Sequence, residues 1–282
     1  MKKIVSFGEI VWDVFIDGKV IGGAPLNFAY YCKRLGCDSK IISAVGRDSD
    51  GIGALETAAF YGISTDLIAA NARPTGEVKV QLDPDGSAQY EIVKDCAWDF
   101  IEYTDAAAEA ASQADAFAFG TLAQRSQTSR NTLEKLLDKC GEKTLKVIDV
   151  NLRQRYYNKE IMDFSLNRAD VVKMNEAELK RICDLFRYNG DTLMRAKFIF
   201  DAFDLQYLLL TRGAEGYTIF ERGGMFIGRA KPAKTVDTVG AGDAFFAAFV
   251  SSILNGEDSE IAAEKGAELA ALVCMHRGAF FK

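Results

Sequence analysis

Histidine is nearly absent from this chain of 282 residues, and its scarcity excludes several kinds of active site. The single histidine, His276, rules out a zinc site built from three histidines. A Ser-His-Asp or Cys-His triad would have to use this one residue, so we do not expect nucleophilic catalysis of that type. Six cysteines are scattered with no Cys-x-x-Cys pair, which indicates reduced thiols, most of them buried, in a cytoplasmic protein.

Long apolar runs and basic clusters are missing as well. No hydrophobic stretch approaches the roughly 20 residues that span a bilayer, and the first residues lack the apolar core of a signal peptide. The 34 Lys and Arg residues against 40 Asp and Glu give a formal charge of −6, a poor match for a nucleic-acid backbone. Only four prolines occur and no linker is visible. We therefore expect one cytoplasmic domain, residues 1–282, with neither a membrane nor a nucleic acid as its partner.

Short apolar runs alternate with helical patterns along most of the sequence. The runs are continuous, which is typical of parallel strands buried on both faces. This alternation predicts a three-layer α/β/α fold in which helices cover both faces of a mostly parallel central sheet. The predicted strands are 4–7, 41–45, 116–119, 147–150, 171–174 and 207–211, with an antiparallel edge hairpin at 217–220 and 225–228. The predicted helices are about 24–36, 50–61, 105–113, 126–140, 175–186, 190–204, 240–254 and 259–275.

Two stretches break this rhythm. Residues 78–93 alternate apolar and polar side chains on either side of an Asp-Pro-Asp-Gly-Ser turn, which predicts a hairpin with one wet face. The segment 12–20, with an Asp-Gly turn of its own, is able to pair with that hairpin. We expect the two stretches, over about 12–21 and 73–100, to form a small β-lid on the large domain. An ordinary surface hairpin is the alternative.

The edges of such a small sheet bear on assembly. Unpaired strand edges favour pairing with another chain. Val78, Val80 and Leu82 alternate onto one face, which a second copy of the lid would bury. We therefore expect a homodimer that forms through the lid.

The strongest chemical signal is the turn Gly240-Ala241-Gly242, which runs directly into an apolar helix. A buried helix must find partners for its first backbone amides. Small residues let a ligand approach those amides, and the helix dipole helps them to form an anion hole. Asp243 follows in the first turn, where it either caps the helix or acts as a general base beside the hole. Neither the Walker pattern nor the dinucleotide-binding glycine pattern is present.

A second glycine-rich segment, Gly22-Gly23, precedes another helix start. Pro25 stands at an early helical position, as helix starts favour. Asn27 lies in the first turn and is able to face the same cleft as Asp243. On its own this segment is a weak signal.

Together the two segments resemble the signatures of the ribokinase-like, or PfkB, family of carbohydrate kinases. Gly22-Gly23-x-x-x-Asn27 matches the N-terminal signature, and Asp237-Thr238-x-Gly-Ala-Gly-Asp243 matches the highly specific C-terminal one. The resemblance covers essentially the whole chain. It implies a ribokinase-like α/β/α fold with a β-lid, and it implies transfer of the γ-phosphoryl group of ATP to a sugar with the help of Mg²⁺.

The resemblance also implies roles for single residues. Asp13 matches the acidic residue that binds sugar hydroxyls. Asp243 would be the general base, beside the amides of Gly240, Ala241 and Gly242. The residues expected on the nucleotide side are Asn175, Thr211, Gly213, Gly216, Gly240 and Gly242.

Two cation sites follow from the same resemblance. Glu178, in Asn-x-x-Glu, would hold Mg²⁺ through water. Asp237 and Val239 would hold a monovalent cation such as K⁺, together with backbone oxygens of the C-terminal tail. The sequence stops soon after His276, so we expect little dependence on potassium.

Within the family, the segment Gly-Gly-Ala-Pro-x-Asn at 22–27 is most similar to fructokinases. Ala97-Trp98-Asp99 and Asp149-Val150-Asn151-Leu152-Arg153 strengthen that similarity. The resemblance thus implies a ketohexose substrate, phosphorylated at a primary hydroxyl, namely D-fructose converted to fructose 6-phosphate. The residues expected to bind the sugar are Asp13, Gly23, Asn27, Trp98, Asn151, Arg153 and Asp243.

Other readings stay open. A ribokinase, a 2-keto-3-deoxygluconate kinase or another sugar or nucleoside kinase of the family would share most of this scaffold. A non-catalytic sugar- or nucleotide-binding protein on the same fold belongs to a different class of function. Arg153 is placed to reach a phosphate or a substrate carboxylate, and a surface ion pair is its alternative role.

Overall fold

The structure, a computed structural model, describes residues 1–15, 18–82 and 88–281. Over these residues the strands form a nine-stranded sheet in the order β13-β12-β11-β10-β9-β8-β1-β4-β5. All neighbours from β11 to β5 pair in parallel, and β12 and β13 add an antiparallel edge hairpin. The strands of this sheet are β1 (Lys3–Phe7), β4 (Asp38–Gly46), β5 (Ile68–Asn71), β8 (Ala116–Gly120), β9 (Leu145–Asp149), β10 (Val171–Asn175), β11 (Tyr207–Thr211), β12 (Tyr217–Glu221) and β13 (Gly224–Gly228).

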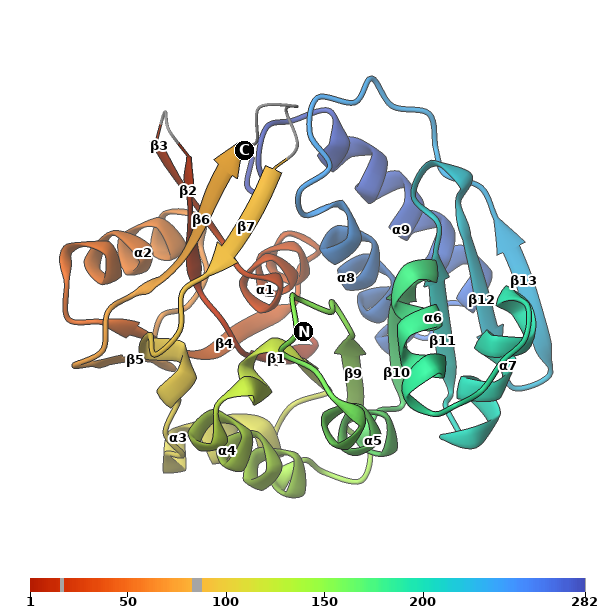
Figure 1. Ribbon diagram of the computed structural model, residues 1–282, viewed down its shortest axis with the longest axis horizontal. Coiled ribbons are helices and arrows are strands. Elements are labelled where there is room, and N and C mark those ends of the chain that lie inside the picture. The colour runs from red at the N-terminus through yellow and green to blue at the C-terminus, as the bar shows by residue number, and fades with distance from the viewer. Residues whose placement is uncertain (16–17, 83–87, 282) are drawn as a thin grey trace.

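Helices cover both faces of this sheet (Figure 1). One face carries a core built with α1 (Ala24–Arg34), α2 (Ser49–Phe60), α8 (Ala241–Leu254) and α9 (Ser259–Cys274). The other face carries a core built with α3 (Asp105–Ser112), α4 (Gln127–Lys139), α5 (Lys159–Arg168), α6 (Glu176–Leu185) and α7 (Thr192–Ala202). The predicted three-layer α/β/α architecture is therefore confirmed. Among the helices of the described residues, none has the length and apolar character needed to cross a bilayer.

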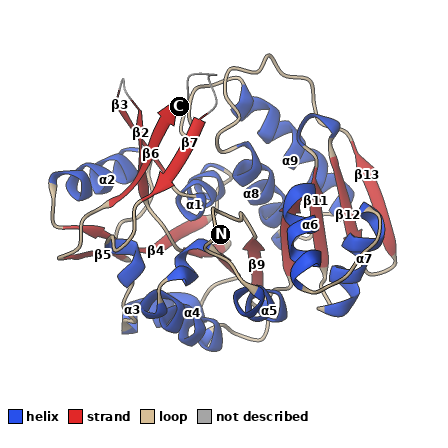
Figure 2. Ribbon diagram, viewed as in Figure 1, coloured by secondary structure: helices blue, strands red, loops and turns tan. Residues whose placement is uncertain are grey.

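A second, four-stranded sheet stands beside the first, in the order β3-β2-β6-β7 (Figure 2). Its strands are β2 (Val11–Phe15), β3 (Gly18–Gly22), β6 (Gly76–Leu82) and β7 (Ala88–Ile92). The two predicted segments therefore do pair, because β2 runs parallel to β6 and antiparallel to β3. Within the predicted turns, Asp17 and residues 83–87 lie outside the described part of the chain.

The chain itself covers both faces of this small sheet at β2. On one face, Trp12 Nε1 donates to the carbonyl of Asp50 in α2 at 2.9 Å. On the other face, Val78 pairs in register with Asp13 and is buried in the main core. The apolar face that suggested a dimer is thus already covered at Val78, and the side chains of Val80 and Leu82 are not described. A dimer through this sheet stays a prediction.

Most predicted elements lie where the sequence pattern placed them, but α5 and β5 were not predicted. The buried residues of α5 are Ile161, Met162, Ser165 and Leu166, a mixed pattern that hides its apolar stripe. In β5 only Ile68 is buried, because the strand forms the exposed edge of the sheet. The six cysteines are free, and Cys32 is buried as expected, whereas Cys274 is half-buried.

The two sheets meet around Trp98, in a short 3-10 helix at Ala97–Phe100. The Trp98 side chain is fully buried, and the Arg125 guanidinium lies 4.0 Å from its ring centroid. Arg125 Nε also pairs with Asp99 Oδ1 at 2.7 Å, with both side chains almost inaccessible. Gly76, the first residue of β6, closes the junction, since a Cβ there would lie 2.3 Å from Trp98 Nε1.

We expect Gly76→Ala to lower the free energy of unfolding by about 1–3 kcal/mol, because the added methyl group overpacks a rigid junction. Gly224→Ala is the matched control, since a Cβ at Gly224 would meet no heavy atom within 4 Å. Urea denaturation of both variants and the wild type measures the difference. If Gly76→Ala is as stable as Gly224→Ala, the residues of the junction can move to accommodate the methyl group, and the expectation of a rigid junction is wrong.

Candidate active site

The site is built around the start of α8. Gly240 is the N-cap residue with φ 81°, in the left-handed region that favours glycine. Ala244 to Val250 are all buried, so the helix is fixed in the core and its polar first turn is left at the edge of the sheet. The Ala241 N–H donates to the Thr238 carbonyl at 3.2 Å. The amides able to face an anion are therefore those of Gly242 and Asp243.

Asp243 is tied to the start of α1. Asn27 Nδ2 donates to Asp243 Oδ2 at 2.8 Å. The Asn27 side chain is buried, and its Oδ1 has no hydrogen-bond partner among the described residues, so it is an acceptor available to a ligand hydroxyl. Gly23, the N-cap of α1 with φ 115°, has no room for a side chain, since a Cβ would lie 2.3 Å from the Glu9 carbonyl.

Three carboxyl groups in this region hold their protons unusually tightly. Burial raises the pKa of Asp243 to about 6, and the neighbouring Asp149 carboxylate adds to the rise. Burial likewise raises the pKa of Glu9 to about 7 and that of Asp13 to about 6. The Arg153 guanidinium opposes the rise in all three pKa values, which places its positive charge within range of the whole cluster.

A buried ion pair lies beneath the start of α8. Lys173 Nζ, from β10, donates to Asp149 Oδ2, from β9, at 2.6 Å. Burial opposes a charged Lys173, but the Asp149 and Asp243 carboxylates outweigh it and raise the Lys173 pKa. A Cβ at Gly242 would lie 3.2 Å from Lys173 Nζ, so the ammonium group sits directly beside the anion hole.

Glu178 is fixed at the start of α6 by a reciprocal capping box. Its Oε2 accepts from the Asn175 N–H at 2.8 Å, while Asn175 Oδ1 accepts from the Glu178 N–H at 2.9 Å. Burial and the Asp149 carboxylate raise the Glu178 pKa. Asp149 Oδ1 is buried without a hydrogen-bond partner among the described residues. An orphaned carboxylate oxygen near Glu178 fits a hydrated Mg²⁺, which prefers oxygen ligands and keeps several waters.

Two cavities meet at adjacent residues of α8. The first is lined by Asp243, Asn151, Glu9 and Asp149, with apolar residues of α1 and β8, and holds about 20 Å³. That is room for a single water molecule, and Asp13, Asn27 and Arg153 are not part of this lining. The second, about 570 Å³, is lined by Gly242 and Ala241 together with Thr211, Gly213, Ala214, Gly216, Tyr217, Pro232, Phe245, Ala267, Ala270 and Cys274.

The second cavity has the size and the apolar lining of a cofactor-sized site. It brings together four residues that the sequence assigned to a nucleotide, Thr211, Gly213, Gly216 and Gly242. Asn175 pairs in register with Thr211 on the neighbouring strand, but it is not part of this lining and its side chain caps α6. Trp98 lines neither cavity and is buried at the junction of the sheets.

The loop before α8 contains the two residues expected to hold a monovalent cation, Asp237 and Val239. Asp237 Oδ1 accepts from the Val239 N–H at 3.0 Å, and Asp237 Oδ2 accepts from the Gly278 N–H at 2.9 Å. The carbonyl of Ala279, in the tail that packs on this loop, accepts from the Tyr31 hydroxyl. Each of these oxygens accepts one protein donor and keeps a second lone pair, so the hydrogen bonds do not exclude an ion. A monovalent cation at Asp237 and Val239 stays a prediction. Among the described residues, no cluster of three acidic, histidine or cysteine side chains is placed to hold a metal ion.

Sequence reasoning missed Glu9, Asp149 and Lys173 as site residues. Lys173 carried a signal, since a lysine in the middle of a continuous apolar strand is rarely buried without a charged partner. Asp149 and Glu9 both follow buried strands at the carboxyl edge of the sheet, where ligands bind in open α/β folds. The backbone of Asn151 is also unusual, because its φ of 40° lies in the left-handed region that residues other than glycine rarely adopt.

Comparison with known proteins agrees with this geometry. The sequence model of the pfkB family of carbohydrate kinases matches residues 1–281. Fructokinase of Klebsiella pneumoniae is 30% identical over 264 residues, which cover 89% of this chain and 84% of that protein. Fructosamine kinase FrlD of Bacillus subtilis is 26% identical over 290 residues, with 99% and 93% covered.

Solved structures match over almost the whole chain. An uncharacterized sugar kinase from Pyrococcus horikoshii in complex with ATP superposes with a TM-score of 0.83 at 26% identity, covering 98% of this chain and 93% of that one. Fructokinase with bound ATP from Xylella fastidiosa gives a TM-score of 0.84 at 21% identity, with 99% and 94% covered. The second similarity concerns the fold alone.

We expect Asp243→Asn to stabilise the protein at pH 8 and to lose this effect near pH 4. The ionised Asp243 destabilises the folded state above its folded pKa of about 6, and this penalty vanishes below the ordinary value of 3.8. Asparagine keeps an acceptor for Asn27 but carries no charge. Urea denaturation at both pH values measures the effect, with Glu142→Gln, on an exposed loop, as the control. Equal stabilisation at pH 8 and pH 4 would contradict the raised pKa.

Proposed function

The chain belongs to the pfkB family of carbohydrate kinases, and on that premise we propose that it transfers the γ-phosphoryl group of ATP to a primary hydroxyl of a ketohexose. D-Fructose, converted to fructose 6-phosphate, is the proposed substrate. The fructokinases of Klebsiella pneumoniae and Escherichia coli, at 30% and 28% identity, support that choice among sugars.

One observation carries the proposal. Gly242 lines the large apolar cavity, and the next residue, Asp243, lines the small one. A nucleotide in the first and a sugar at the second would meet across the first turn of α8. The amides of that turn stabilise charge on the phosphoryl group while Asp243 takes the proton of the accepting hydroxyl.

Each part of the site has a place in this reaction. Asp243 is half-buried, and its raised pKa suits a group that must accept a proton near neutral pH. Lys173, beside Gly242, neutralises charge that builds up on the transferring group. The residues we assign to the sugar are Asp13, Gly23, Asn27, Asn151, Arg153 and Asp243. Those assigned to the nucleotide are Thr211, Gly213, Gly216, Gly240, Ala241 and Gly242.

ATP and Mg²⁺ are the proposed co-substrate and cofactor. The ATP complexes of the kinases from Pyrococcus horikoshii and Xylella fastidiosa support ATP. Glu178 would hold Mg²⁺ through water, next to the orphaned Asp149 Oδ1. When bound, the ion neutralises the charge of the phosphates.

A sugar acid is the second candidate substrate, and Arg153 is the observation that favours it. The Arg153 charge acts on Glu9, Asp13 and Asp243 alike, so it lies near the sugar side of the site. A guanidinium group is well suited to bind a substrate carboxylate. The 2-keto-3-deoxy sugar acids carry such a group, whereas fructose does not.

The four-stranded sheet is the proposed lid of this single domain, over about 12–21 and 73–100. It supplies Asp13 to the site, and it is joined to the main body at Trp98. A small sheet joined to the main body at one junction is able to move toward the site when the sugar binds. Closure would exclude the water that otherwise accepts the phosphoryl group.

We expect Asp243→Asn to lower kcat by roughly 10²–10⁴, because the general base is lost while shape and polarity are kept. Calorimetric titration should show unchanged ATP affinity. Asp13→Asn is the contrasting variant: it should mainly raise KM for the sugar. A kcat above about a tenth of wild type in Asp243→Asn would exclude the assigned role.

We expect kcat/KM for fructose to exceed those for ribose and 2-keto-3-deoxygluconate. A missing hydroxyl contact leaves a buried polar group unpaired and costs one to several decades. Coupled ADP release across the three sugars is the measurement. If the sugar acid is preferred tenfold, the fructose assignment fails and Arg153→Ala should abolish that preference.

We expect sugar binding to slow hydrogen exchange in β2 and β6, because closure shields these strands. Mass spectrometry with and without fructose, in the absence of ATP, measures this. Exchange in α7, on the far face of the large sheet, serves as the internal control. Equal exchange in β2 and β6 under both conditions would argue against a lid.

A further inference from the structure

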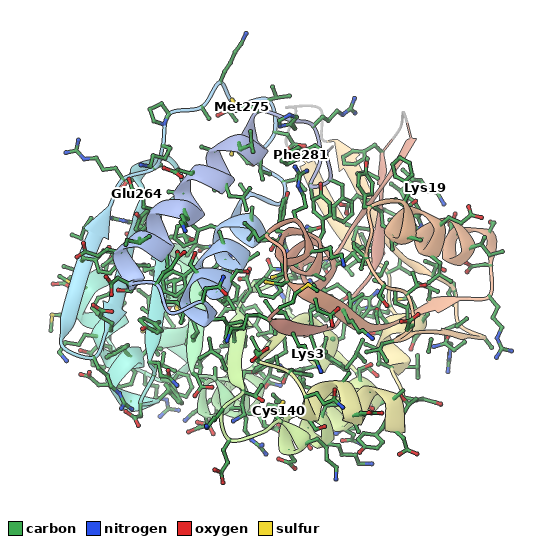
Figure 3. All side chains as sticks on the ribbon, turned by 180° about the vertical axis from the view of Figure 1, so that it is seen from behind. Lys3, Lys19, Cys140, Glu264, Met275 and Phe281 are labelled. Carbon is green, nitrogen blue, oxygen red and sulfur yellow. The ribbon has the colours of Figure 1, made fainter. Side chains whose placement is uncertain are left out.

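The chain after α9 turns back across the molecule. Figure 3 shows Phe281 between α1 and the end of α9, where Met275 is labelled. The Tyr30 hydroxyl and Arg34 Nη1, both from α1, donate to the Phe281 carbonyl. We call the segment Gly278–Phe281 the strap, since it is held to α1 and passes directly behind the start of α8.

The strap touches the anion hole at its N-cap residue. A Cβ at Gly240 would lie 2.7 Å from Ala279 Cβ and 3.0 Å from the Tyr31 hydroxyl oxygen. Ala279 and Tyr31 therefore form the wall against which the Gly240 turn rests. On the other side of the turn, Asp237 accepts from the strap's Gly278 N–H at 2.9 Å.

Tyr31 fixes the strap at this point. Its side chain is fully buried, and its hydroxyl donates to the Ala279 carbonyl. Tyr31 follows Asn27 by one helical turn, so both project from the same face of α1, one to Ala279 and the other to Asp243. Burial and the Asp243 carboxylate raise the Tyr31 pKa, so the hydroxyl keeps its proton and remains a donor.

We propose that Tyr31 is a positioning residue of the phosphoryl-transfer site, which holds the Gly240 turn in place through the strap. This inference rests on the proposed kinase function. The Tyr31 hydroxyl fixes the Ala279 carbonyl and the Gly278 N–H fixes Asp237, so the turn is held on both sides. An anion hole displaced by about 1 Å costs roughly 10²-fold in rate, so its support acts on catalysis as well as on stability.

The chain offers a matched control next to Tyr31. Tyr30→Phe also removes one hydroxyl that reaches the strap, and with it the bonds that this hydroxyl accepts from the Phe281 N–H and from Arg34 Nη1. Arg34 Nη1 still donates to the Phe281 carbonyl. Tyr31→Phe instead removes the donor that the structure gives the Ala279 carbonyl. The two variants change the same atom type on neighbouring residues, and only one of them stands behind Gly240.

We expect Tyr31→Phe to lower kcat at least tenfold, with KM values for sugar and ATP within threefold of wild type. Tyr30→Phe should keep kcat within twofold. A stability role alone would lower the melting temperature and leave kcat per folded molecule unchanged. If kcat of Tyr31→Phe stays within twofold of wild type, the inference is wrong.

A measurement without substrate separates this inference from the kinase proposal. Hydrogen exchange over residues 238–244 should be faster in Tyr31→Phe and unchanged in Tyr30→Phe. Unaltered exchange in Tyr31→Phe would overturn the inference even in an active kinase. A different pair of results is also informative: the wild-type protein phosphorylates no sugar, and exchange is still faster in Tyr31→Phe. This outcome would overturn the kinase proposal and leave the structural role of the strap intact.

Discussion

The site depends on the burial of one apolar helix whose polar first turn must stay uncovered. The residues of α8 from Ala244 to Val250 are all buried in the core, and their burial fixes the direction of the helix axis. Its first turn is then held at the carboxyl edge of the sheet, where a backbone with unsatisfied N–H groups meets ligands. Everything else in the site is arranged around that turn: α1 from one side, Lys173 from below and the strap from behind.

The site also concentrates buried negative charge. Glu9, Asp13 and Asp243 share a poorly solvated region, and Asp149 adds a fourth carboxylate. Lys173 balances part of this charge within the buried layer. Such a cluster opposes folding, which is the usual mark of a region shaped for binding rather than for stability. An incoming cation, or a proton taken from a substrate, relieves the repulsion.

The sequence allowed the layers, the parallel sheet and the start of α8 to be predicted, because these depend on local patterns. Glycine before an apolar helix is visible in one segment, and so is the alternation of strand and helix. Lys173 carried a local signal, but its pairing with Asp149 was beyond that reach, because only the folded sheet brings the two adjacent strands together. Trp98 has a structural role that its motif did not reveal, since its buried ring joins the two sheets. The contact between the strap and α1 could not be predicted either, because no local sequence pattern indicates that the two segments pack together.

The hydrogen bond between Asn27 and Asp243 joins residues 216 positions apart in the chain. Contacts of such long range close late in folding, because the entropy of the intervening loop is lost before they form. A ribosome releases α1 long before α8, so the first half of the sheet can assemble while the Asn27–Asp243 pair is still incomplete. In a refolding experiment, recovery of secondary structure should therefore precede recovery of activity, and a chaperone that binds the waiting α1 surface would act in that interval.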